Sequence, residues 1–108
     1  MGGGVKEEPA APDSLIEGFA DALWMERGLS ANTLAAYQSD LRAFAAWLAT
    51  ERGLGLAGAS RLDLLDYLAR LSLQGLKPRS AARRLSCLRQ FYQYLLRIGT
   101  LREDPSAR

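Results

Sequence analysis

The apolar residues of this sequence recur at intervals of three and four positions, and this spacing restricts the possible folds more than any other feature. One run follows it without a break: Leu34, Tyr37, Leu41, Phe44 and Leu48. Such spacing places apolar side chains on one face of an α-helix. A half-buried strand would instead alternate apolar and polar residues, and the sequence has no such alternation of useful length. The pattern therefore predicts an all-α fold.

Capping residues divide the chain into helical segments. Ser14 is followed three positions later by Glu17, which fits a capping box at the start of a helix. Ser30 and Ser60 are suited to cap two later helices, because a serine oxygen can accept from the free N–H groups of the first turn. Pro78 suits the first turn of a fourth helix, where its missing N–H removes no hydrogen bond. We predict helices over residues 14–27, 30–51, 60–74 and 78–98, packed as a small orthogonal bundle of the four-helix type.

The predicted fourth helix has a different chemistry on each face. At 100° per residue, one side is an apolar stripe expected to face the core: Ala81, Leu85, Leu88, Tyr92, Leu95 and Leu96. The opposite side is polar and rich in arginine: Arg79, Arg83, Ser86, Cys87, Gln90, Tyr94 and Arg97. In the third helix, the residues expected to face one way are Leu62, Leu65, Leu68 and Ala69.

The charges of the chain are unevenly distributed along it. Residues 1–58 carry four basic and eight acidic side chains, whereas residues 59–108 carry ten basic and four acidic ones. Six basic residues and no acid lie between Lys77 and Arg97. A cluster of this kind is expected on a surface that binds phosphate, although a solvated helix face is an equally good explanation of the charge alone.

Several classes of function are disfavoured by composition. The sequence has no histidine and one cysteine, Cys87, so we expect no disulfide, no metal site, no cofactor and no small-molecule substrate. Nucleophile arrangements that need histidine are excluded, and we predict no catalytic residue in this chain. Its apolar runs are too short to span a membrane, and the start of the sequence lacks a secretory signal, so we expect a cytoplasmic protein.

The two ends of the sequence are predicted to lie outside the bundle. Residues 1–13 are rich in glycine, proline and charge without a hydrophobic period, which predicts a disordered tail. Residues 14–100 form the predicted helical domain. Residues 101–108 become polar and include Pro105, as expected for the start of a linker to a further domain.

The polar face of the fourth helix has side chains suited to reading DNA. Arginine can donate two hydrogen bonds to guanine, and glutamine can pair similarly with adenine, so Arg79, Arg83, Gln90 and Arg97 are candidates for contacts in a major groove. Simple solvent exposure is the competing interpretation. At the start of the second helix, Asn32 and Thr33 could donate to a phosphate or could serve only in helix capping.

Two segments carry a family resemblance. The segment Glu26-Arg-Gly-Leu-Ser-Ala-Asn-Thr-Leu-Ala-Ala-Tyr37, within residues 16–41, resembles the opening helices of Xer-type tyrosine recombinases of the phage integrase family. Residues 80–95 and the segment Arg102-Glu-Asp-Pro-Ser106 resemble the fourth helix of that family and its exit toward a catalytic domain. The resemblance spans about residues 14–107, and the XerD type is preferred to the XerC type.

The resemblance implies a SAM-like core-binding domain that forms half of a clamp on a recombination half-site. Its implied partners are double-stranded DNA, a partner Xer recombinase and the catalytic domain of the same protein, acting in the resolution of chromosome dimers at cell division. It adds Ala36, Arg84 and Cys87 as contact positions and suggests a phosphate contact for Lys77. The full set of predicted DNA-binding residues is Asn32, Thr33, Ala36, Lys77, Arg79, Arg83, Arg84, Cys87, Gln90 and Arg97.

The alternative is a helical module that docks a partner protein through its first or fourth helix. An enzyme fragment with an activity of its own is the least favoured interpretation. Neutralising phosphates releases counterions, so a salt-dependent interaction with DNA would distinguish a DNA-binding domain from a protein-docking module.

Overall fold

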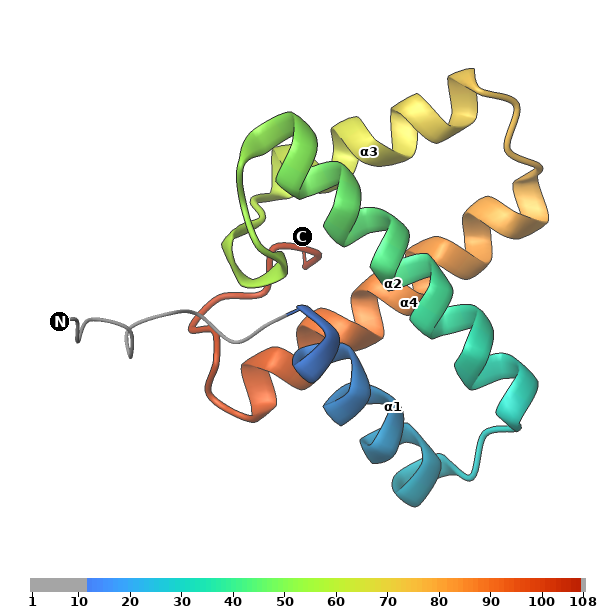
Figure 1. The fold of residues 1–108 in the computed structure, drawn as a ribbon, viewed down its shortest axis with the longest axis vertical. Helices are drawn as coiled ribbons and strands as arrows, with labels where there is room; N and C mark the ends of the chain where they lie inside the picture. The colour runs from blue at the N-terminus through green and yellow to red at the C-terminus, as the bar shows by residue number, and fades with distance from the viewer. Residues whose placement is uncertain (1–11, 108) are drawn as a thin grey trace, which may run out of the picture.

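The computed structural model describes residues 12–107, and residues 1–11, most of the predicted tail, lie outside them. The described part contains four α-helices, α1 (Pro12–Arg27), α2 (Ala31–Arg52), α3 (Arg61–Leu73) and α4 (Pro78–Arg97), and a short 3-10 helix, η2 (Leu56–Gly58) (Figure 1). It has no strand, which confirms the predicted all-α fold. None of its helices is both long and apolar enough to cross a membrane.

The predicted caps are correct for two of the helices. Ser30 Oγ accepts the N–H of Thr33 at 3.1 Å and so caps α2. Ser60 caps α3 in a complete capping box, in which the Asp63 carboxylate accepts the N–H of Ser60 at 2.9 Å. This hydrogen bond is the main cause of a lowered pKa for Asp63. Because each cap satisfies N–H groups that have no partner within the helix, the starts of both helices follow from local sequence.

The first helix begins earlier than predicted. It starts at Pro12, so Ser14 lies within its first turn and does not cap it. The helix therefore includes residues 12 and 13, which were predicted to belong to the tail. A proline at the first helical position is favourable because its missing N–H would have had no partner there. Asp13 then lies in the first turn, where a carboxylate complements the helix dipole.

The helices α2 and α4 cross at the centre of the molecule, and α1 and α3 lie on either side of the crossing (Figure 1). The core at the crossing is closely packed and fully buried. From α2 it contains Leu41, Phe44 and Leu48, and from α4 it contains Phe91, Tyr92 and Leu95. Phe19 of α1 packs edge-on against Phe91, with ring centroids 5.4 Å apart. Tyr67 of α3 contacts Phe44, with centroids 4.8 Å apart.

The buried face of α4 is rotated relative to the prediction. Leu88, Tyr92 and Leu95 are buried as expected, but Leu96 is 40% exposed. Phe91 and Cys87, which were not assigned to the core stripe, are both fully buried. The difference arises because α1 and α2 both pack on α4, so its buried face is wider than a single stripe and turned toward them.

The predicted apolar face of α3 is not its buried face. Of Leu62, Leu65, Leu68 and Ala69, which were expected to face one way, Leu68 packs against the core, whereas the exposed fractions of Leu62 and Leu65 are 70% and 49%. The side buried against α2 and α4 is formed instead by Leu64 and Tyr67. This helix has leucines on both sides, so its hydrophobic spacing alone could not indicate which side is buried.

Residues 101–107 do not leave the domain as an extended linker. Leu101 packs against the core, and the Arg61 Nη1 donates to the carbonyl oxygen of Ala107 at 2.7 Å. The Asp104 carboxylate accepts both the N–H and the hydroxyl of Ser106, at 2.8 and 2.6 Å. This segment therefore folds back onto the start of α3 within the described residues.

One buried hydrogen bond joins the loop after α2 to the core. The hydroxyl of Tyr92 donates to the carbonyl oxygen of Leu56 at 2.6 Å, and both residues are buried. Burial also raises the pKa of Tyr92, so the hydroxyl is a donor at any ordinary pH.

Tyr92→Phe is expected to lower the free energy of unfolding by about 1 kcal/mol, because it removes the shorter of the two hydrogen bonds that the buried Leu56 carbonyl accepts and leaves only that from the N–H of Ala59, at 3.4 Å. Urea denaturation measures this difference. Tyr94→Phe is the matched control, since the Tyr94 hydroxyl makes no hydrogen bond within residues 12–107 and its ring is only half-buried. Equal losses in the two variants would contradict a stabilising role for the hydrogen bond to Leu56.

Candidate nucleic-acid interface

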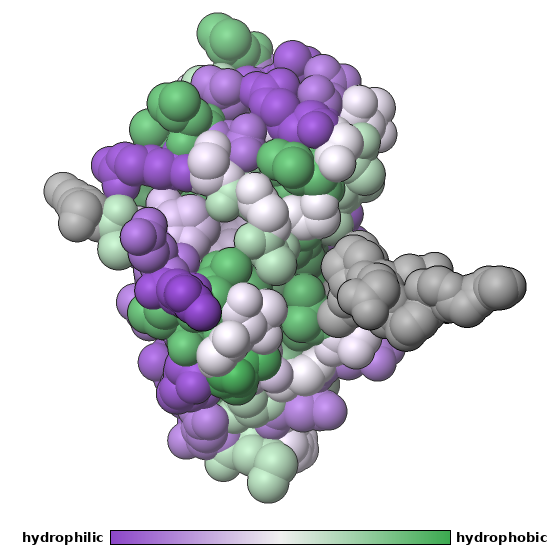
Figure 2. Space-filling model, turned by 90° about the vertical axis from the view of Figure 1, so that its left-hand side faces the viewer, coloured by the Kyte–Doolittle hydropathy of each residue, from purple (hydrophilic) through white to green (hydrophobic). Residues whose placement is uncertain are grey.

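The N-terminal ends of α2 and α4 lie toward the same side of the molecule, on the right in Figure 1. The segment 101–107 lies toward the opposite side. Figure 2 views that opposite side, where hydrophilic and apolar patches are interleaved and no continuous hydrophilic surface is formed. Short loops place the C-terminal ends of α1 and α3 on this side as well, so the partial charges of the four helix ends largely offset one another and the charged side chains set the potential there.

Three basic side chains on or next to α4 are free of ion pairs within the described residues. Lys77, Arg79 and Arg89 are exposed, and no carboxylate of residues 13–107 lies within ion-pair distance of them. Lys77 and Arg79 are at the start of α4. Arg89, which sequence reasoning did not select, lines a hollow with Leu65 and Pro105 on the α3 side of the helix. The first two therefore belong to the candidate interface and Arg89 does not.

Arg97 is the predicted contact nearest the other end of α4. It forms an ion pair with Glu26 of α1 at 3.1 Å, and both side chains are more than half exposed. Its charge is thus balanced locally, and it lies far along the helix from Lys77. The structure does not bring Arg97 together with the cations at the start of α4.

Arg83 is held by a buried carboxylate of α2. Its Nε and Nη2 donate to the two carboxylate oxygens of Asp40, both at 2.9 Å. Asp40 is only 6% exposed, whereas the Arg83 side chain is 43% exposed. The hydrogen bond to Asp40 is the main cause of a raised pKa for Arg83. Arg83 was predicted only as a DNA contact on the polar face of the helix, and the structure shows that it also joins α4 to α2.

Arg84 points into the molecule. Its Nη1 donates to the hydroxyl of Tyr67 at 2.9 Å, and its Nε lies 3.6 Å from Asp40. The side chain is 20% exposed. Burial raises the pKa of Tyr67, and the charge of Arg84 and its hydrogen bond oppose that rise. Arg84 therefore joins α4 to α3, a role that the sequence did not predict. At 100° per residue Arg84 lies about 40° from Leu88 on the helical wheel, which could have indicated an inward direction.

Cys87 is fully buried, which contradicts its prediction as a surface contact. Its Sγ lies 3.6 Å from the carbonyl oxygen of Tyr37 in α2. Burial raises the pKa of the thiol to about 12, so it is uncharged near neutral pH. A small side chain is required here because α2 and α4 approach each other closely at their crossing.

Gln90 is committed to contacts within the domain. Its Oε1 accepts from Nη1 of Arg27 at 2.8 Å. Its Nε2 donates to the hydroxyl of Tyr37 at 3.2 Å and to Oγ of Ser86 at 3.1 Å. These contacts connect α1, α2 and α4, so the amide that was predicted to read a base is already paired.

The candidate residues of α2 lie at its N-terminal end. Asn32 is exposed, whereas Thr33 and Ala36 are half-buried. The hydroxyls of Thr33 and Ser30 are 3.0 Å apart and belong to the helix cap. Of the predicted residues in the first turns of α2 and α4, Asn32, Lys77, Arg79 and Arg83 are exposed and Thr33 and Ala36 are half-buried, and the N-terminal ends of these two helices lie toward the same side of the molecule (Figure 1). Asp40, which orients Arg83, was not identified from the sequence.

Comparison with known proteins identifies the class of domain. The family described as "Phage integrase, N-terminal SAM-like domain" matches residues 16–99, from the first turns of α1 to just beyond the end of α4. This chain therefore belongs to the family of phage integrase N-terminal SAM-like domains.

Its individual relatives are recombinases. The chain is 54% identical over 92 residues to tyrosine recombinase XerD of Pseudomonas aeruginosa, which covers 85% of this chain and 30% of that protein. It is 50% identical over 95 residues to XerD of Proteus mirabilis, covering 88% and 30%. For XerD of Vibrio cholerae it is 43% identical over 101 residues, covering 93% and 33%. These matches confirm the predicted resemblance to XerD recombinases, and the chain spans about a third of the length of these curated relatives.

Proposed function

We propose that this chain binds double-stranded DNA through the N-terminal ends of α2 and α4, as the DNA-binding domain of a site-specific recombinase. The observation that carries the proposal is the pair of exposed, unpaired cations Lys77 and Arg79 at the start of α4. Cations that neutralise phosphates supply much of the affinity of proteins for DNA. In this role Lys77 and Arg79 contact the backbone and fix the position of the domain.

Arg83 is the candidate for direct contact with a base. Asp40 occupies its Nε and one hydrogen of Nη2, which leaves the Nη1 hydrogens and one Nη2 hydrogen for another acceptor. Because the guanidinium is already held in place, little side-chain freedom remains to be lost on binding. The half-buried Ala36 and the exposed Asn32 leave room for DNA beside it.

The proposal extends to the whole recombinase. The nucleophilic tyrosine and its basic partners would lie in a catalytic domain that follows these residues, with residues 101–108 at the start of the connection. A partner Xer recombinase would complete the assembly that recombines two DNA sites and resolves chromosome dimers at cell division. Such a protein would work in the cytoplasm, and its cleavage step would need no metal or cofactor from this domain.

Binding to a labelled DNA duplex at several salt concentrations tests this function. If Lys77, Arg79 and Arg83 each neutralise a phosphate or lie close to one, the slope of log K against log salt should be about −2 to −3. The affinity should therefore fall steeply when the salt concentration is raised from about 50 to about 200 mM. Lack of binding at the lowest salt concentration, or binding that ignores salt, would contradict the proposal.

A second candidate function, docking of a partner protein, is favoured by one observation. The outer face of α3 exposes three leucines, Leu62, Leu65 and Leu73, with exposed fractions of 70%, 49% and 89%. Exposed apolar patches are common at protein interfaces. This surface is on a different helix from the cations of α4, and an interaction through it would depend weakly on salt.

A further inference from the structure

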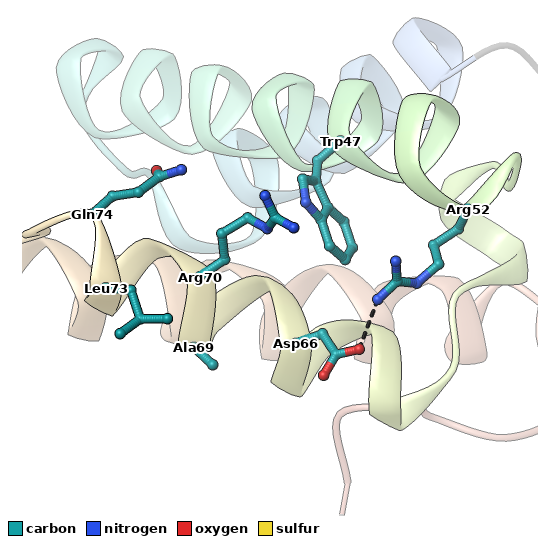
Figure 3. Close-up of a pocket in the computed structure, with 7 residues that line it drawn as sticks. All are labelled: Trp47, Arg52, Asp66, Ala69, Arg70, Leu73 and Gln74. Atoms are coloured by element: carbon teal, nitrogen blue, oxygen red, sulfur yellow. Dashed lines mark hydrogen bonds and ion pairs between the residues drawn. The ribbon is translucent and has the colours of Figure 1, made fainter.

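A surface groove of about 480 Å³ lies between the second half of α2 and α3. Figure 3 shows the seven side chains that line it: Trp47, Arg52, Asp66, Ala69, Arg70, Leu73 and Gln74. None of them belongs to the candidate DNA-binding residues described above. The groove is polar at both ends, with different chemistry at each.

The indole of Trp47 forms the wall of the groove on the α2 side. Its ring packs against Tyr67 and Phe44, with centroid distances of 5.3 and 6.2 Å, and the Arg52 guanidinium lies 4.8 Å from the ring centroid. The Nε1 atom is shielded from solvent, yet it has no hydrogen-bond acceptor within the described residues. Buried N–H groups are nearly always paired, so this donor is available to an acceptor that enters the groove.

Two further donors lie at the same end of the groove. Arg70 is exposed, and its guanidinium lies next to the indole nitrogen of Trp47 (Figure 3). It forms no ion pair with a carboxylate of residues 13–107. The amide of Gln74 extends toward the same space (Figure 3). This end of the groove therefore presents N–H groups and an unpaired positive charge.

The acid of the groove is at its other end and is already paired. Asp66 accepts from Nη2 of Arg52 at 2.7 Å, as the dashed line in Figure 3 shows. Arg52 also donates to Asp63 at 3.1 Å through its Nε. Because Asp63 and Asp66 share one arginine, this end of the groove keeps a net negative charge, whereas Arg70 makes the end near Trp47 positive. The ligand that fits beside Trp47 and Arg70 is therefore an anion with hydrogen-bond acceptors.

We propose that the Trp47 Nε1, the Arg70 guanidinium and the Gln74 amide bind a phosphate of the DNA backbone, an inference that rests on the proposed function. DNA is favoured over an acidic peptide because Gln74 is separated from Lys77 by only two residues, and Lys77 begins the basic end of α4. The C-terminal end of α3, where Gln74 lines the groove, and the start of α4 lie toward the same side of the molecule (Figure 1). The groove thus extends the DNA contact beyond α2 and α4 onto α3.

The indole N–H of Trp47 reports directly on this contact. In ¹⁵N-labelled protein the two tryptophans give two indole N–H resonances, which a Trp24→Phe variant assigns. On titration with a DNA duplex the Trp47 resonance should move downfield, whereas that of Trp24, which is 57% exposed on α1, should not. Movement of Trp47 with a poly-glutamate peptide and not with DNA would overturn the proposal in favour of an acidic protein ligand.

Arg70→Gln provides the second measurement on the same DNA. It should weaken binding several-fold at low salt and make the salt slope less steep by roughly 0.9, the value for one phosphate contact. Arg102→Gln, which removes one exposed arginine from the segment after α4, should leave the slope unchanged. If the parent chain binds DNA with a steep slope but Arg70→Gln keeps both slope and affinity, this inference fails and the proposed function stands. If the parent chain does not bind DNA, both fail.

Discussion

Asp40→Ala is expected to lower the free energy of unfolding by about 2–3 kcal/mol, the largest loss of stability expected here from removing a charge. Asp40 is 6% exposed and accepts two hydrogen bonds from Arg83, and its Oδ1 also lies 3.6 Å from Nε of Arg84. Without the carboxylate, Arg84 becomes a largely buried cation with no counter-charge. The expected loss of stability is smaller than the largest losses seen when one partner of a buried ion pair is removed, because Arg83 is 43% exposed and can be solvated.

Thermal unfolding followed by circular dichroism measures this effect as a fall in Tm of roughly 10 °C or more. Asp21→Ala is the matched control, because Asp21 is an exposed aspartate of α1 and forms no ion pair within the described residues. Its change should be within about 0.5 kcal/mol. If the two variants are equally stable, the carboxylate of Asp40 does not hold α2 to α4.

The double substitution Lys77→Gln and Arg79→Gln is expected to weaken DNA binding by about 30-fold or more at low salt. Each charged contact contributes roughly 1 kcal/mol or more, and 1.4 kcal/mol corresponds to a factor of ten in affinity. The salt slope should become less steep by roughly 1.8, since two phosphate contacts are lost. Stability should change little because both side chains are exposed and free of ion pairs within residues 13–107.

A control with the same change in net charge is Arg42→Gln with Arg102→Gln. Arg42 pairs with Asp13 at 3.6 Å, and Arg102 lies in the segment that follows α4. This variant should retain most of the affinity, with only a weak general loss of attraction. Equal effects of the two double variants would mean that binding follows total charge and not the position of cations on α4.

Local structure could be predicted well from the sequence because its causes are local. The caps at Ser30 and Ser60, and Pro78 at the start of α4, depend on residues three positions apart or fewer. The family resemblance rested on short segments, each read along the sequence without knowledge of the packing, and it was confirmed. By contrast, which face of α3 is buried depends on where α2 and α4 lie. The sequence alone could not separate Leu62 from Leu64, because both are leucines.

The candidate site was harder to predict because its contacts join distant residues. Asp40 and Arg83 are 43 positions apart, and Gln90 and Arg27 are 63 apart. Neither pair could be seen without the packing of the helices. The polar face of α4 contained both kinds of residue, those that hold the bundle together and those left on the surface, and composition does not separate them. Arg79 and Arg84 illustrate the two outcomes on a single helix.

The Asp40 carboxylate imposes a limit on attempts to change the DNA preference of this domain by design. A new residue at position 83 would alter what faces the DNA and, at the same time, remove two hydrogen bonds from a buried acid. Libraries that vary Arg83 alone would therefore select for folding first and for base preference second. Varying residues 40 and 83 together, with Arg84 allowed to become apolar, would let the two requirements be met separately.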